Sequence, residues 1–298
     1  MAKIELALGP CFFNWSAERF TDFYARIADE AAVDRVYLGE VVCGKRMPFL
    51  NKVWPEAVDR LTRAGKTVVL STLALPAKGP ERRAVMELAE QDLPIEINDL
   101  SALPARAGRP FVAGPFLNVY NESSLAHLAE QGATDWCPPV ELPLSSIEAA
   151  AAANPGVTVE LFAFGRLPLA LSGRCYHARA HGLSKDSCQF VCDRDPDGME
   201  VETLEGERFL AVNGIQTLSS GCQLASLTAA DLAQSGIGRL RLSPHTLDMV
   251  EVTGHYRALL DGECSVEETA ARLHAMPLPG AACNGYLAGD AGWRAVAQ

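Results

Sequence analysis

Four cysteines of the chain could together bind one metal centre. Cys175, Cys188 and Cys192 lie close together in the segment SGRCYHARAHGLSKDSCQFVC, and Cys43 lies far upstream in VYLGEVVCGKR. Thiolates are soft ligands that suit both iron–sulfur clusters and zinc. The C-x12-C-x3-C run is neither the C-x2-C pairing of many structural zinc sites nor the spacing of the common ferredoxins. The residue types alone therefore leave both metals open.

The surroundings of the three clustered cysteines favour ligation over core packing. Buried structural cysteines usually sit among apolar side chains, whereas this stretch is polar and contains glycine. His177 and His181 could ligate a metal if their segment were helical, with hydrogen bonding or substrate binding as the alternative. We expect the cysteines without a partner at ligand spacing to be apolar or loop residues: Cys11, Cys137, Cys222, Cys264 and Cys283.

Alternating strands and helices must position these cysteines. Apolar runs predict strands at 3–9, 34–41, 66–75, 95–99, 110–120, 134–139, 157–165 and 237–244. Helical periodicity predicts helices at 16–31, 55–65, 80–91, 122–133, 145–154, 244–263 and 265–276. Only a short link joins the fourth and fifth strands, so a barrel built from them can be distorted or incomplete at that point.

This alternation is typical of an α/β fold with parallel strands, and closing the strands gives a (β/α)8 barrel. An open doubly wound sheet is the alternative. A barrel carries its site at the C-terminal ends of its strands. Cys43 follows the second strand, and the other three cysteines lie in a long irregular excursion at about 168–225, after the seventh. We therefore expect one barrel-like domain over 1–298, with all four thiols on one face.

Composition and charge limit the class of protein. A net charge of −11 disfavours nucleic acid as a partner, because an acidic surface repels phosphates. The N-terminus lacks the features of a signal peptide, and no apolar run approaches the roughly 18 residues of a membrane span. We expect a cytoplasmic protein with no membrane span, whose nine cysteines are thiols or ligands. The H-E-x-x-H, G-x-S-x-G and G-x-G-x-x-G motifs are absent from the sequence.

Polar residues near the predicted strand ends are further candidates for this face. Arginines there could clamp a carboxylate, and a salt bridge within the loop layer is the alternative for each. These candidates are Glu40, Lys45, Arg46, Asn118, Tyr120, Glu141, Arg166 and Arg174.

Three segments resemble a known family. VYLGEVVCGKR, FLNVYNESSLAHLAEQGA and GRLPLALSGRCYHARAHGLSKDSCQFVC look like the collagenase-like peptidase family, and within it the UbiU and UbiV groups of oxygen-independent ubiquinone biosynthesis. The resemblance covers nearly the whole chain, and the cysteine spacing favours the UbiV group. It implies a barrel-like α/β fold and a [4Fe–4S] cluster bound by Cys43, Cys175, Cys188 and Cys192, with 168–225 as an iron–sulfur insertion.

The resemblance also implies a function. It implies a subunit of an oxygen-independent hydroxylase of the ubiquinone ring, active as a heterodimer with a UbiU-type partner on a small-molecule quinone precursor during anaerobic biosynthesis. Peptidase activity is not expected, because the sequence offers neither a nucleophile paired with a base nor an open zinc–water site. RNA-base hydroxylation and a metal-stabilised scaffold without its own catalysis are the alternatives. Glu40 and His177, which flank the cysteines, are our candidates for handling protons.

Overall fold

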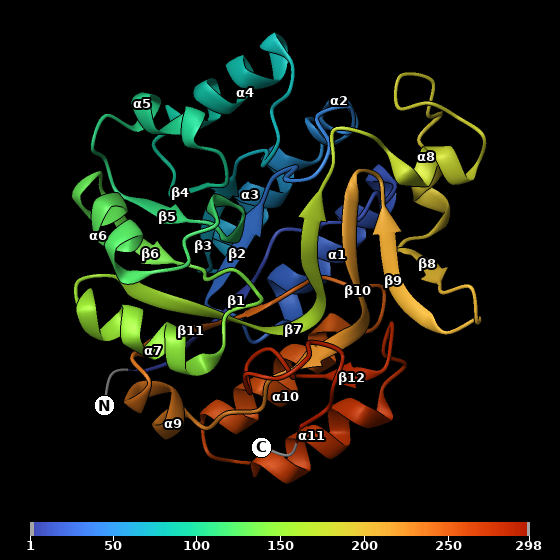
Figure 1. Ribbon diagram of the computed structural model, residues 1–298. Coiled ribbons are helices and arrows are strands. Elements are labelled where there is room, and N and C mark those ends of the chain that lie inside the picture. The colour runs from blue at the N-terminus through green and yellow to red at the C-terminus, as the bar shows by residue number, and fades with distance from the viewer. Residues whose placement is uncertain (1–2, 297–298) are drawn as a thin grey trace.

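Eight parallel strands close into a barrel in the computed structural model, which describes residues 3–296. Each strand pairs with the next along the chain, and β11 pairs with both β7 and β1, which completes the ring (Figure 1). The predicted barrel is therefore confirmed, and the open sheet is not formed. The barrel strands are β1 (Glu5–Leu8), β2 (Arg35–Leu38), β3 (Thr67–Ser71), β4 (Ile95–Ile97), β5 (Phe111–Ala113), β6 (Ala133–Trp136), β7 (Thr158–Leu171) and β11 (Ile237–Leu242).

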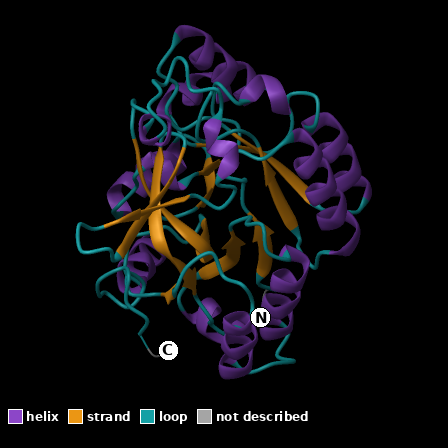
Figure 2. Cartoon of the chain, turned by 90° about the vertical axis from the view of Figure 1, so that its right-hand side faces the viewer, coloured by secondary structure: helices purple, strands orange, loops and turns teal. Residues whose placement is uncertain are grey.

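Helices lie outside the strands, as Figure 2 shows. In the first helix, Ser16 accepts a hydrogen bond from the Arg19 amide and caps the start, while Phe20, Tyr24 and Ile27 form one buried face. Among residues 3–296, no helix is both long enough and apolar enough to cross a membrane. The helices are α1 (Ala17–Glu30), α2 (Met47–Leu50), α3 (Trp54–Arg63), α4 (Gly79–Ala89), α5 (Leu103–Arg106), α6 (Glu122–Glu130), α7 (Leu144–Ala153), α8 (Tyr176–Ala180), α9 (Ala229–Gln234), α10 (Met249–Leu260) and α11 (Val266–Ala275).

The link between the fourth and fifth strands does not interrupt the barrel. A 3-10 turn, Leu100–Ala102, and the short helix α5 fill this link, and β4 still pairs with β5 in parallel. A single helical turn is thus enough to carry the chain between these neighbouring strands.

The excursion after the seventh strand is more regular than the sequence predicts. It contains β8 (Met199–Glu202), β9 (Arg208–Asn213) and β10 (Gln216–Leu224), and these strands extend the sheet in antiparallel order from β7. Figure 1 shows them gathered with α8 beside β7. The prediction of irregular structure over 168–225 is wrong because edge strands need no continuous apolar run; β8 has no fully buried residue.

Charged side chains fill part of the barrel interior. Arg241 on β11 donates to Glu160 on β7 at 2.6 Å and to Glu96 on β4 at 2.5 Å. Its guanidinium also lies 4.1 Å from the centre of the Tyr37 ring, whose hydroxyl donates to Glu160 at 2.5 Å. Arg239 adds a second cation, 3.0 Å from Glu160. Because every charge here has an opposite partner, these buried ions join strands from several sides of the barrel.

Replacing Glu160 by Gln should destabilise the fold strongly. The change leaves two buried guanidiniums short of a negative charge, and breaking a buried pair in this way costs about 3–5 kcal/mol. Urea unfolding followed by circular dichroism measures the loss. Glu5→Gln is the matched control: the half-exposed Glu5 also contacts Arg239, at 2.6 Å, so its loss should cost under about 1 kcal/mol. Equal effects of the two changes would contradict this role for Glu160.

The same carboxylate should make the fold sensitive to acid. Burial alone raises the pKa of Glu160, but Arg241 and Arg239 outweigh it and lower that pKa from 4.5 to about 2. Ionised Glu160 therefore stabilises the folded state above pH 4.5, and this contribution is lost as the pH falls from 4.5 towards 2. Unfolding free energies across this range should fall less steeply for the Glu160→Gln protein than for the unchanged protein.

Candidate functional site

The structure brings the four cysteines of the predicted metal site together. Cys43, Cys175, Cys188 and Cys192 line one small pocket, called here the cysteine pocket. Cys175 and Cys192 are buried, Cys43 and Cys188 are partly exposed, and all four are free thiols. Two segments far apart in the sequence therefore supply soft ligands to one place.

The loop that carries Cys43 is held by Glu40. One oxygen of this buried carboxylate accepts hydrogen bonds from the amides of Val42 and Cys43, both at 2.8 Å. Burial raises the pKa of Glu40, and Arg46, 3.7 Å away, opposes that rise. Glu40 does not line the cysteine pocket. Its contacts therefore make it a positioning residue for the Cys43 loop.

The turn between β9 and β10 holds the other side of the pocket. The Cys175 thiol donates to the Gly214 carbonyl at 3.2 Å and accepts from the Ala178 amide at 3.3 Å, which caps the start of α8. Asn213 donates to the Cys192 carbonyl at 2.8 Å. The antiparallel strands that the sequence did not predict therefore support two of the four cysteines.

Two cations contact the sulfur atoms. Lys45 Nζ lies 3.5 Å from Cys188 Sγ, and Arg46 Nη2 lies 3.5 Å from Cys192 Sγ. Arg46 is almost fully buried and also donates to Asn213 at 2.6 Å. Burial raises the pKa of Cys192, while Arg46 opposes the rise. Binding to a metal would remove the thiol protons, and the resulting negative thiolates would be stabilised by both cations.

His177, the second candidate for handling protons, is buried and also lines the cysteine pocket. Burial lowers its pKa, while the Val212 carbonyl and Asp195 oppose the shift. His181 follows α8 as its C-terminal cap, so the segment between the two histidines is helical, as metal ligation by the pair would require.

The remaining cysteines stay outside the pocket. Cys11, Cys137, Cys222 and Cys283 are buried and Cys264 is partly exposed. Burial raises the pKa of Cys137 to about 12 and that of Cys283 to about 11, which keeps these thiols protonated.

A second pocket, the strand-end pocket, has a volume of about 250 Å³ at the C-terminal ends of the barrel strands. It lies close to the cysteine pocket. The amide of its lining residue Ala74 donates at 2.9 Å to the carbonyl of Val41, two residues before Cys43, and the amide of Ser172, next to lining residue Leu171, donates at 2.9 Å to the carbonyl of Ile215 in the cysteine pocket. One apolar cluster runs through the walls of both pockets. The lining residues are Ala74, Leu75, Pro115, Phe116, Asn118, Pro139, Val140, Glu141, Pro168, Leu169, Ala170 and Leu171.

The other predicted polar candidates divide between this pocket and the scaffold. Asn118 and Glu141 line the strand-end pocket, and Tyr120 donates to Glu141 at 3.0 Å. Burial, followed by Glu141, raises the pKa of Tyr120 to about 12. Arg166 lies within β7 rather than after it and donates to main-chain carbonyls and Glu200, so it stabilises the scaffold. Arg174 is exposed.

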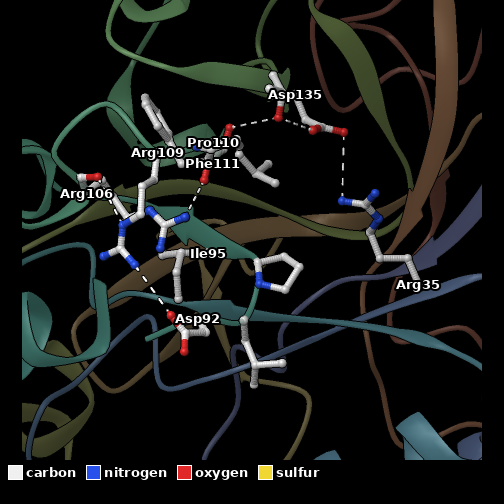
Figure 3. Close-up of a pocket in the computed structure, with 12 residues that line it drawn as sticks. Arg35, Asp92, Ile95, Arg106, Arg109, Pro110, Phe111 and Asp135 are labelled. Atoms are coloured by element: carbon white, nitrogen blue, oxygen red, sulfur yellow. Dashed lines mark hydrogen bonds and ion pairs between the residues drawn. The ribbon is translucent and has the colours of Figure 1, made fainter. Parts of the chain in front are cut away.

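A larger pocket of about 410 Å³ lies at the opposite end of the barrel (Figure 3). Its arginines are already engaged: Arg106 and Arg109 donate to main-chain carbonyls, and Arg35 lies 3.8 Å from Asp135. Barrel enzymes place their sites at the C-terminal ends of the strands, whereas the N-terminal end serves stability. We therefore assign the candidate site to the cysteine pocket and the strand-end pocket.

Solved structures similar to this chain include three enzymes. N-acetylneuraminate lyase from Mycoplasma synoviae is 9% identical with a TM-score of 0.46, over 91% of this chain and 78% of that chain. A putative fructose-1,6-biphosphate aldolase from Coccidioides immitis is 11% identical with a TM-score of 0.41, over 91% and 86%. A mandelate racemase/muconate lactonizing protein from Paracoccus denitrificans is 16% identical with a TM-score of 0.39, over 54% and 48%. Likenesses this weak add nothing to what the strand pairing shows.

A family model gives a clearer result. The model of peptidase family U32 matches residues 16–291, which is most of the chain and includes all four cysteines of the pocket. The resemblance to the collagenase-like peptidases is confirmed at this level, and the protein belongs to peptidase family U32.

Proposed function

We propose that Cys43, Cys175, Cys188 and Cys192 bind a [4Fe–4S] cluster. The observation that carries this proposal is their meeting in one pocket. A cubane cluster needs four thiolates directed at one centre, and the pocket supplies four. The spacing matches neither the C-x2-C pairing of many zinc sites nor that of the common ferredoxins, so the resemblance to the UbiV group is what favours iron–sulfur over zinc.

The charges around the pocket support an anionic centre. An oxidised [4Fe–4S] core with four thiolates carries a net double negative charge, and Lys45 and Arg46 bring two positive charges to Cys188 and Cys192. Hydrogen bonds to cluster sulfurs and nearby charges are the means by which proteins set cluster potentials. Four protein ligands fill the iron positions, which favours electron transfer or structural support over substrate binding at iron.

Within family U32 we propose a UbiV-type role for this protein. It would be the cluster-bearing subunit of an oxygen-independent ubiquinone-ring hydroxylase in the cytoplasm, acting with a UbiU-type partner in anaerobic biosynthesis. Most residues that line the strand-end pocket are apolar types, while Asn118, Glu141 and main-chain atoms make much of its accessible surface polar. Apolar side chains with a few polar groups suit the substituted ring of a quinone precursor, and the pocket lies close to the cysteines.

Replacing a pocket cysteine should remove iron. Anaerobically purified protein should be brown, with four irons per chain, and its visible absorbance should bleach on reduction. Cys188→Ser should lose most of this iron and colour. Cys264→Ser is the matched control, because Cys264 is also partly exposed but lies outside the pocket. Colourless protein with stoichiometric zinc would overturn the cluster assignment.

Removing the Lys45 charge should lower the reduction potential of the cluster. Reduction adds negative charge, which the ammonium at 3.5 Å from Cys188 stabilises. Lys45→Met should shift the potential downward by roughly 60 mV, equivalent to about 1.4 kcal/mol for one electron. A redox titration followed by electron paramagnetic resonance measures it. Lys78→Met, at an exposed lysine whose ammonium lies 3.5 Å from Asp186, is the control. An unchanged potential in Lys45→Met would contradict the role of this charge.

A charge in the strand-end pocket should abolish function while leaving the cluster intact. Leu169→Glu places a carboxylate in the apolar wall of the pocket and should block a quinone precursor. Quinone profiles of a deletion strain complemented with this variant should show a defect without oxygen and none in air. Leu204→Glu, at a fully exposed leucine, should complement normally. Loss of an RNA hydroxylation in place of ubiquinone would contradict the proposed role.

A further inference from the structure

We infer that His177, His181 and Asp195 form a second metal site, which takes a divalent first-row transition-metal ion beside the cysteine pocket. One ligand atom from each residue lies within 4.8 Å of the other two. None of the three is a cysteine, so the site shares no ligand with the proposed cluster. This inference goes beyond the proposed function.

Both ring nitrogens of His177 face an oxygen atom. Nδ1 lies 3.3 Å from the Val212 carbonyl, and Nε2 lies 3.1 Å from an Asp195 carboxylate oxygen. A neutral imidazole has one N–H group, so it can donate to only one of them. With the proton on Nδ1, the lone pair of Nε2 faces a carboxylate, and a cation between the two atoms removes the repulsion.

The contacts of His177 are those of a metal ligand. The ring is fully buried, and although Nε2 lies 3.1 Å from Asp195, their alignment is not that of a hydrogen bond, so Nε2 has no hydrogen-bond partner within residues 3–296. Histidines that bind metals usually donate their other N–H to a carbonyl or carboxylate, which fixes the tautomer and the ring. The Val212 carbonyl on β9 occupies that position.

His181 distinguishes a metal ion from a simple proton. A proton alone would need only His177 and Asp195, yet the ring of His181 lies beside that of His177, with centroids 5.4 Å apart. The two histidines are four residues apart at α8, which places them on one helical face. Two imidazoles and one carboxylate suit iron(II), zinc, cobalt(II) or manganese(II), and three protein ligands leave positions open to water.

The two sites are linked through the chain. His177 follows Cys175 by two positions, and Asp195 follows Cys192 by three. An ion held by the histidines and Asp195 would fasten α8 to the segment after the 3-10 turn Val191–Arg194. Cys175 caps the start of α8 and Cys192 lies in that 3-10 turn, so this ion would hold one wall of the cysteine pocket in place.

Cobalt(II) binding tests the inference. Untagged protein, purified without oxygen and carrying its iron, is titrated with Co²⁺ and followed by ligand-field absorbance and by bound cobalt after dialysis. We expect one Co²⁺ per chain with nitrogen and oxygen ligands. His181→Ala and Asp195→Asn should each weaken binding at least about 10-fold, given the effects of losing groups around metal sites. His127→Ala removes an exposed histidine of α6 and should change nothing.

Several further results would support or overturn the second metal site. A transition metal already present in the purified protein, and absent from the His181→Ala, Asp195→Asn double variant, also supports the site. Equal cobalt uptake by the unchanged protein and the double variant overturns it, as does uptake only with the intense charge-transfer bands of cobalt–thiolate bonds. Thermal unfolding confirms that the variants are folded. Cobalt at the histidines in protein without iron would sustain this inference while removing the proposed function.

Discussion

The buried ion pair between Arg241 and Glu160 is the interaction on which the arrangement of the molecule depends. It joins the last barrel strand, β11, to β7, and the bond from Arg241 to Glu96 reaches across to β4. Closure places β2 only two strands from β7, through β11 and β1. In an open sheet with the same chain order, β2 and β7 would be separated by β3, β4, β5 and β6. The four cysteines meet because the barrel is closed.

Much of this architecture follows from sequence patterns. Apolar runs place all eight barrel strands, because each strand must bury at least one face. The rule that barrel enzymes carry their sites at the C-terminal ends of the strands places Cys43 on the same face as the later cysteines. The burial of charged side chains in the barrel interior was harder to predict. Glu96 and Glu160 interrupt apolar strands, however, and could have indicated buried ion pairs. Edge strands β8 to β10 escaped prediction because their register comes from β7 rather than from their own composition.

Contacts between distant segments were beyond any sequence pattern. Nothing in the spacing relates Asp195 to His177, because the fold alone sets that distance. The same holds for Asn213, which accepts a hydrogen bond from Arg46 and donates to the Cys192 carbonyl. One amide on β9 thus connects the loop after β2 to the segment holding Cys192. The added strands are therefore structural members of the site, and the loop VVCGKR contributes one of the four cysteines and both cations to it.

Cys43 lies far from the other three pocket cysteines in the sequence, so the four are made at different times during translation. Cys43 leaves the ribosome early, with the second strand, while Cys175, Cys188 and Cys192 follow much later and β11 later still. Domains assemble as their segments emerge, beginning from the N-terminus. Until β11 has been made and has closed the ring, Cys43 is not held beside Cys175, Cys188 and Cys192. The four thiols of the pocket therefore come together only late in synthesis, after the ring has closed.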